Sequence, residues 1–166
     1  TLEVSEFRLR PLVKQVLENQ QLTLLSQRVR LDVKIDDLSL IADRSKLRLI
    51  LENLLSNAIK YSPKGGSIHL HARAHGDNWQ LDIADSGSGI PPDERARIFD
   101  AFYTGKVAPG GHVKGTGIGL SVVLEFVNAH GGMIEIVDGE YAGAHFCVRL
   151  PQRAATVQTT EHAHAA

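Results

Sequence analysis

Apolar and polar residues alternate along several short stretches of this chain. A period of two is typical of strands with one face in the core, and it predicts strands at residues 4–9, 29–35, 67–75, 79–85, 133–137 and 144–150. The turn at Gly76, Asp77 and Asn78 lies between two of these stretches and predicts a hairpin. At least part of the fold is therefore expected to be an antiparallel sheet.

Other stretches repeat their apolar residues with the helical period near 3.6. Helices are predicted at residues 12–28, 44–61 and 118–130, and a proline pair introduces a short helix at residues 91–98. Helices and hairpins mixed in this way predict an α/β fold, a two-layer sandwich in which helices cover one face of a mixed, mostly antiparallel sheet. We expect one domain at residues 1–150 and a disordered C-terminal tail at residues 151–166.

The predicted helix at residues 44–61 carries four polar side chains beside its apolar face. On a wheel of about 100° per residue, Asn53, Asn57, Lys60 and Tyr61 follow the edge of the apolar arc. Asparagine disfavours helices because its amide competes for backbone hydrogen bonds, so the presence of two asparagines in this helix needs a reason. A ligand would supply one, since an amide oxygen suits Mg²⁺ and an ammonium group suits phosphate. The alternative is that the amides cap nearby backbone groups and the lysine is solvated.

Asp85 is the last residue of a predicted strand. It is in phase with Trp79, Leu81 and Ile83, so its carboxylate is expected to point toward the core. A buried carboxylate without a donor is costly, and the exocyclic amine of a ligand would satisfy it. The alternative is an Asx turn into Gly87.

Two glycine-rich turns follow, "DSGSGI" at residues 85–90 and "GTGIGL" at residues 115–120. The second leads directly into a predicted helix, whose free N–H groups and positive dipole end suit an anion. Neither turn fits the dinucleotide or P-loop pattern. Between them, residues 103–115 contain four glycines and one proline without periodicity, which predicts a long mobile loop.

Composition narrows the class of protein. A hydrophobic fraction of 43% and a charged fraction of 22% are those of a globular domain. A formal net charge of −1 gives no support for nucleic-acid binding or for direct membrane contact. The single cysteine, Cys147, excludes an internal disulfide. The chain begins at Thr1 without an initiator methionine, and we expect a fragment of a larger protein.

Five motifs occur in order, "NLLSNAIKYS", "DSGSGI", "IFDAFY", "GTGIGL" and "GEYAGAHF". They resemble the N, G1, F, G2 and G3 boxes in the catalytic, ATP-binding domain of two-component sensor histidine kinases. This resemblance covers nearly the whole chain up to about Leu150, and it implies the Bergerat ATP-binding fold shared with DNA gyrase and related chaperones. It also implies a cytoplasmic domain whose parent is a bacterial inner-membrane sensor.

The resemblance assigns a role to each matching residue. Asn57 is implied as the Mg²⁺ ligand and, with Lys60, as the catalytic pair, while Asn53 contacts the phosphates and Tyr61 lies near the adenine. Asp85 is implied as the acceptor for the adenine amine. The remaining implied contacts of ATP come from the glycine turns and the loop between them, namely Gly87, Gly89, Ile90, Phe102, Lys114, Gly115, Thr116, Gly117, Ile118, Gly119 and Leu120.

Some positions depart from the family pattern. The third glycine box is reduced to Gly143 followed by Ala144, and Thr104 stands where relatives often carry arginine. In the gyrase branch a glutamate that activates water occupies the position of Asn53. An amide is no general base near neutral pH, and Glu52 lies on another side of the helix, so phosphoryl transfer is favoured over hydrolysis.

The resemblance implies that the γ-phosphate passes to a histidine on a separate helical dimerisation domain and then to a response regulator. The family's phosphorylated histidine is usually followed by an acidic residue, and none of the eight histidines here is. We therefore expect the isolated chain to bind ATP without phosphorylating itself. His69, His71 and His75 share one predicted strand face, which we interpret as solvated rather than as a metal site.

Two other functions use the same pocket. A serine kinase of the anti-sigma type is one, but the paired phenylalanines of "IFDAFY" favour the histidine kinases. A non-catalytic nucleotide-sensing module is the other, and the retained Asn57 and glycines argue against it. All three readings predict a bound adenine nucleotide.

Overall fold

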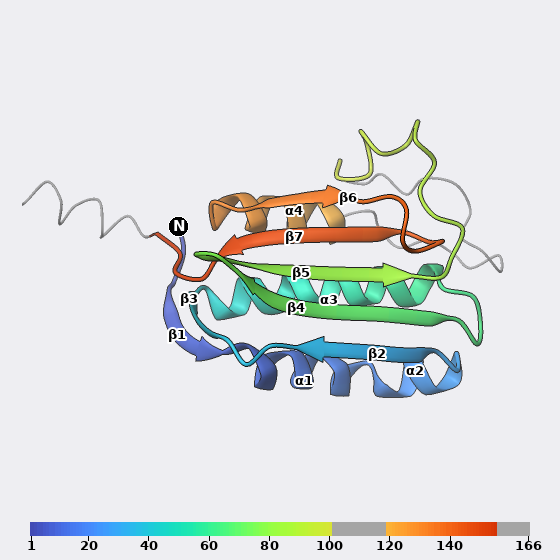
Figure 1. Ribbon diagram of the computed structural model, residues 1–166, viewed down its shortest axis with the longest axis horizontal. Coiled ribbons are helices and arrows are strands. Elements are labelled where there is room, and N and C mark those ends of the chain that lie inside the picture. Colours follow the sequence, from blue (N-terminus) through green and yellow to red (C-terminus); the bar gives the residue numbers. More distant parts are fainter. Residues whose placement is uncertain (101–118, 156–166) are drawn as a thin grey trace, which may run out of the picture.

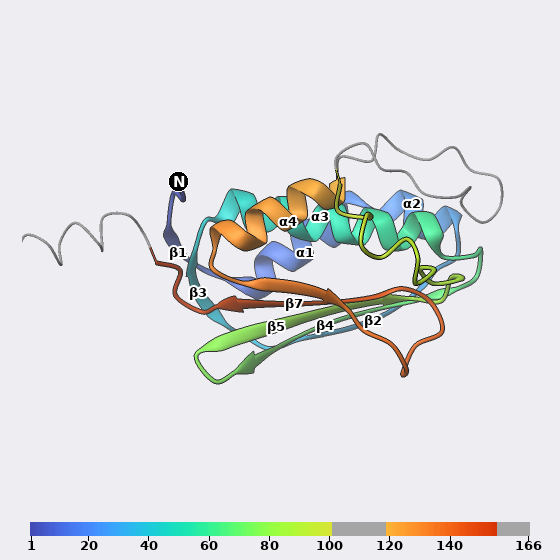
Figure 2. The ribbon, with the colours of Figure 1, turned by 90° about the horizontal axis from the view of Figure 1, so that it is seen from above.

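In the computed structural model, one five-stranded sheet has helices on one of its faces (Figures 1 and 2). The structure describes residues 1–100 and 119–155, so the predicted loop at residues 103–115 lies outside the described ranges. The strands lie in the order β2 (Arg30–Ile35), β4 (Ser67–His75), β5 (Asn78–Asp85), β7 (His145–Pro151) and β6 (Met133–Ile136). Among the neighbouring strands of this described sheet, only β2 and β4 run parallel. The predicted mixed, mostly antiparallel sheet is thus confirmed.

A second, two-stranded sheet lies at one end of the molecule. In it β1 (Ser5–Arg8) pairs antiparallel with β3 (Ser39–Ala42), a strand that the sequence pattern did not predict. The chain returns to β3 after β7, where the backbone N–H of Ile41 donates to Gln152 and that of Ala154 donates to Ile41. The fold therefore continues a few residues beyond the predicted boundary at residue 150.

The helices are α1 (Leu9–Asn19), α2 (Gln21–Ser26), α3 (Arg44–Tyr61) and α4 (Gly119–Ala129). The single helix predicted at residues 12–28 is wrong in two respects. It begins earlier, because Pro11 lies within the first turn, where a missing N–H costs nothing. It also divides at Gln20, whose φ of −106° and ψ of 7° interrupt the helical backbone.

The predicted helix at residues 91–98 is also wrong, since the chain forms consecutive turns there. Most backbone hydrogen bonds in this stretch join residues three positions apart, for example from the N–H of Glu94 to the carbonyl of Pro91. A residue that precedes proline disfavours the helical conformation, so Pro92 hinders a helix from including Pro91. The stretch is nevertheless anchored, because Ile98 is buried in the core.

The longest helix, α3, packs its apolar face on the sheet (Figure 2). Asp43, the residue before the predicted helix at residues 44–61, caps its first turn by accepting from the backbone N–H of Lys46 at 3.1 Å. All seven residues of the predicted apolar arc are buried: Leu47, Ile50, Leu51, Leu54, Leu55, Ala58 and Ile59. Burying one such leucine stabilises the fold by roughly 1.5–3 kcal/mol, so the arc fixes how α3 is rotated. Within the described ranges, the helices are too short or too polar to cross a membrane.

Candidate functional site

The polar stripe of α3, which we define as Asn53, Asn57, Lys60 and Tyr61, follows the edge of the buried arc. All four residues are half-buried. The side-chain amides of Asn53 and Asn57 make no hydrogen bond within the described part of the chain. The alternative in which these amides cap neighbouring backbone is therefore not observed, and both remain available to a ligand.

The C-terminal end of this stripe has its own electrostatics. The Lys60 ammonium nitrogen lies 5.9 Å from the centroid of the Tyr61 ring. Burial raises the pKa of the Tyr61 phenol, and the negative charge of Glu94 raises it further. The phenol is therefore neutral at physiological pH. Glu52 lies outside the stripe, where it pairs with Arg48 at 3.8 Å.

Asp85 lies at the end of β5 and is buried, as predicted. Its Oδ1 atom accepts from the backbone N–H of Gly87 at 2.8 Å and of Ala144 at 3.2 Å. Its Oδ2 atom has no partner among the described residues. Burial raises the pKa of Asp85 to about 6, although the two backbone hydrogen bonds lower it. The Asx turn therefore exists, but it uses one oxygen and leaves the other for a donor.

Glycines allow three chain segments to meet at Asp85. A Cβ atom on Gly87 would overlap the backbone carbonyl of Tyr61, so this turn touches the end of α3. A Cβ atom on Gly143 would overlap Asp85 itself and lie 2.6 Å from the Gly87 nitrogen. The reduced third glycine box thus retains the one glycine whose missing side chain the packing requires.

The other end of the polar stripe meets the beginning of α4. A Cβ atom on Gly119 would lie 3.5 Å from the Asn53 amide oxygen. The first N–H groups of a helix have no partner within it, and its dipole is positive at this end. The stripe therefore runs from the Asp85 turn to a region that favours negative charge.

At their opposite ends α3 and α4 are joined by His130, which is buried. The backbone N–H of Asp43 donates to His130 Nε2 at 3.2 Å, and His130 Nδ1 lies 2.8 Å from the carbonyl oxygen of Phe126. These two partners require a neutral ring with its proton on Nδ1. Lys46 lies over the Phe126 ring, 5.2 Å from its centroid. Sequence reasoning missed this connection, because the two helices are far apart along the chain.

The remaining predicted site residues fall into two groups. Ile90 and Leu120 pack partly buried against the core, and Gly89 has a φ of +81°, which suits glycine. Phe99 packs edge-on against Phe146 with centroids 6.2 Å apart, as an anchor would. The other predicted contacts lie outside the described residues, as does Thr104: Phe102, Lys114, Gly115, Thr116, Gly117 and Ile118.

Cys147 lies in β7 and is buried. Burial raises the pKa of its thiol to about 12, and the nearby charge of Asp82 adds to this. A thiol with so high a pKa is protonated at neutral pH and is a poor nucleophile. We therefore do not expect Cys147 to act as a nucleophile.

Comparison with known proteins gives consistent relatives. Residues 42–154 match the family model of histidine kinase-, DNA gyrase B- and HSP90-like ATPases. Sensor histidine kinase GlrK of Escherichia coli (strain K12) is 32% identical over 150 residues, which are 90% of this chain and 32% of GlrK. The chain thus spans about a third of the length of this relative.

Two solved structures are similar over nearly the whole chain. The catalytic domain of histidine kinase ThkA has a TM-score of 0.80 and 26% identity, covering 92% of this chain and 97% of that domain. Full-length ShkA in complex with AMPPNP has a TM-score of 0.78 and 28% identity, covering 95% of this chain and 33% of ShkA. The ThkA domain confirms the predicted fold. Because the family model matches residues 42–154 of a 166-residue chain, this chain belongs to the histidine kinase-, DNA gyrase B- and HSP90-like ATPases.

Proposed function

We propose that this chain is the ATP-binding catalytic domain of a sensor histidine kinase, with residues 1–154 as the folded unit. It holds Mg-ATP and presents the γ-phosphate to a histidine on a separate helical dimerisation domain. One observation carries this proposal: the polar stripe of α3 touches the Asp85 turn at one end and the start of α4 at the other. From Asn53 to Tyr61 this distance is about 12 Å along the helix axis.

In this proposal the two ends of the stripe bind opposite ends of the nucleotide. The Asp85 Oδ2 atom accepts from the adenine amine, and the Gly87 turn and Tyr61 lie beside the base. Asn53, Lys60 and the start of α4 face the phosphates. Lys60 contributes a point charge, and the dipole of α4 adds to it. The free oxygen of Asp85 and the free amides of the stripe support this orientation.

The donor set of the stripe fits Mg²⁺. This ion prefers oxygen ligands and commonly takes only one or two from the protein, since phosphate oxygens and waters complete its shell. Asn57 offers one neutral amide oxygen that has no partner among the described residues. When bound there, the ion neutralises charge on the phosphate oxygens. The protein's own part is to hold the triphosphate in line and to leave the γ-phosphate accessible to the acceptor histidine.

Transfer to a protein acceptor suits this site better than hydrolysis. Activation of water needs a general base near the γ-phosphate. The stripe residue beside the start of α4 is Asn53, whose amide cannot accept a proton, and the nearby Glu52 pairs with Arg48. ThkA has been solved in complex with response regulator protein TrrA. We propose that the parent of this chain is an inner-membrane sensor. A response regulator of that kind would be the final acceptor of its phosphate.

The decisive experiment uses radiolabelled ATP. The chain alone should acquire no acid-labile, alkali-stable label, because none of its histidines is followed by an acidic residue. Addition of the helical dimerisation domain of its parent should place such a label on that domain's histidine. The reaction should be slow, because two untethered partners lack the effective concentration of an intact chain.

The rival functions give different outcomes in the same assay. An acid-stable label on a serine of a partner protein would identify a serine kinase. Binding of ATP with no transfer to any helical partner would indicate a nucleotide-sensing module. Label on one of this chain's own histidines would refute the proposed division of roles.

A further inference from the structure

The helices leave one face of the sheet uncovered (Figure 2). This face carries several histidines. Side chains that alternate along β4 place His69, His71 and His75 on this outer face. The sequence predicted that all three would be solvated. His75 is exposed, as expected, but His69 and His71 are half-buried and share a partner, Asp32.

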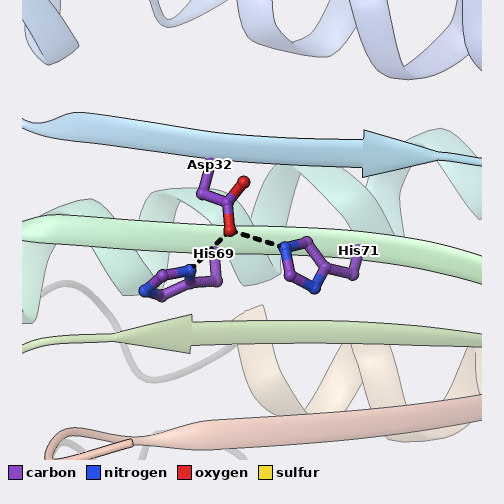
Figure 3. Close-up of side chains that lie close together, drawn as sticks. All are labelled: Asp32, His69 and His71. Atoms are coloured by element: carbon purple, nitrogen blue, oxygen red, sulfur yellow. Dashed lines mark hydrogen bonds and ion pairs between the residues drawn. The ribbon is translucent and has the colours of Figure 1, made fainter.

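Asp32 comes from β2, the parallel neighbour of β4, where it lies opposite His69. Its Oδ2 atom is 3.0 Å from His69 Nδ1 and 2.9 Å from His71 Nε2. All three potential ligand atoms lie within 4.8 Å of one another. Figure 3 shows the two rings turned toward the same carboxylate oxygen from either side.

We propose that Asp32, His69 and His71 form a binding site for a first-row divalent transition-metal ion of the Zn²⁺ type. Two imidazole nitrogens and one carboxylate oxygen are a donor set of such ions, and with three protein ligands a fourth position stays open to water. Hard cations such as Mg²⁺ prefer oxygen ligands alone. The ion bound here therefore differs in kind from the one that accompanies ATP.

The present distances are close to those that coordination requires. Ligand atoms about 2.0–2.1 Å from a tetrahedral ion lie roughly 3.3 Å from one another. The two distances to Asp32 Oδ2 need to lengthen by a few tenths of an ångström, and the two ring nitrogens already lie within 4.8 Å of each other. Side-chain rotation achieves this without a change in the sheet, since these side chains are 26–40% exposed. On binding, each ring would carry its proton on the nitrogen that faces away from Asp32, so that the lone pair of His69 Nδ1 or His71 Nε2 faces the ion.

The orientation of His69 is already restrained. The ring of Tyr141 lies over it with centroids 4.6 Å apart and an interplanar angle of 33°. His71 meets the His69 ring edge-on at 5.9 Å. Rings held in place lose less conformational freedom when they bind an ion. The strand pairing between β2 and β4 holds the third ligand, so a rigid element supports each of the three.

Binding is tested on the full chain by calorimetry with Zn²⁺, in nucleotide-free buffer without a chelator. We expect one ion per chain, and Co²⁺ in its place should give the intense visible absorption of a tetrahedral complex. His71→Ala and Asp32→Ala should each weaken Zn²⁺ binding at least about tenfold. His75→Ala is the matched control, because His75 lies on the same strand face outside the cluster and should leave the affinity unchanged.

Two further variants separate this site from other sources of binding. Replacement of both His162 and His164 by alanine should also leave the affinity unchanged, so loss of binding in that variant would overturn the proposal. Asp32→Asn keeps the size of the side chain and serves if Asp32→Ala does not fold. Unchanged Zn²⁺ affinity in a folded His69→Ala, His71→Ala double variant would overturn the proposal as well. So would the absence of Zn²⁺ binding at micromolar concentration in the unaltered chain, whereas excess Mg²⁺ should not displace the ion.

Discussion

Replacement of Asp85 by asparagine should change nucleotide affinity and fold stability in opposite directions. The variant keeps an oxygen that accepts from Gly87 and Ala144, so the turn is preserved. It places an amide N–H₂ group where the unpartnered Oδ2 atom now lies. The change therefore removes a buried charge, and it replaces the hydrogen-bond acceptor that faces the ligand with a donor.

The gain in stability follows from the pKa of Asp85. The difference between the ordinary value of 3.8 and the folded value of about 6 corresponds to roughly 3 kcal/mol that the fold loses by keeping the charge. Asp85→Asn should therefore raise the free energy of unfolding by about 2–3 kcal/mol at pH 7.5. Because the folded pKa is the higher one, the wild-type chain regains this stability as the pH falls from about 6 to 3.8. The difference between the two proteins should vanish over that interval.

The loss in affinity follows from the hydrogen bond to the adenine amine. A hydrogen bond to a charged group contributes about 1.5–3 kcal/mol, so the Kd for ATP should rise by roughly 10- to 150-fold. A guanine carbonyl would be repelled by the Asp85 carboxylate and attracted by the asparagine amide. The wild-type chain should therefore prefer ATP to GTP, and the variant should lose most of that preference.

Calorimetric titration with ATP and GTP, together with urea unfolding at pH 7.5 and 4.5, measures both effects. Asp82→Asn is the matched control on the outer face of the same strand. Burial there acts to raise the pKa of Asp82, but hydrogen bonds from Gln80 and His145 outweigh it and lower that pKa. The control should thus leave ATP affinity unchanged and lower stability at pH 7.5. Equal wild-type affinities for ATP and GTP would refute the role given to Asp85.

Two other substitutions, each with a control variant, test the remaining parts of the site. Asn57→Ala removes the oxygen assigned to Mg²⁺, so the Mg²⁺-dependent part of ATP affinity should fall. Ser56→Ala, at the exposed neighbouring position, should not alter it. An unchanged Mg²⁺ dependence in Asn57→Ala would contradict the assignment. Gly143→Ala forces a methyl group into Asp85 and should cost about 1–3 kcal/mol in urea unfolding. Gly119→Ala has room beside Asn53 and should stay within about 0.5 kcal/mol of the wild type. Similar losses of stability in Gly143→Ala and Gly119→Ala would argue against the close packing described at Asp85.

The fold could be predicted where local signals agree. The helix α3 was predicted to the residue, because Asp43 caps its start and a proline with two glycines follows its end. Four-residue β3 was missed, because β1, the strand with which it pairs, lies more than 30 residues earlier in the chain. The break at Gln20 was missed for a different reason, since glutamine carries no turn signal.

In the candidate site as well, contacts between residues far apart in the sequence could not be predicted. Period-two alternation predicted that Asp85 is buried, but not that Ala144, 59 residues away, donates to it. The sequence predicts solvated histidines on β4 because it does not reveal that Asp32, on the parallel neighbour β2, contacts them. Pairings of this kind depend on sheet order, which a single sequence does not specify.

The hydrogen bonds of His130 connect α3 and α4 at one end of the helix pair. From His130 to Gly119 the axis of α4 measures about 16 Å, so a rotation of about 5° at His130 moves the start of α4 by roughly 1.4 Å. That end is the one beside Asn53. We therefore expect His130→Ala to alter ATP affinity at a distance, and an affinity equal to that of the exposed control Asn128→Ala would show that the two helices move independently. If ATP affinity does change, the spacing between the start of α4 and the phosphates is set by a residue at the other end of that helix, which contacts no phosphate.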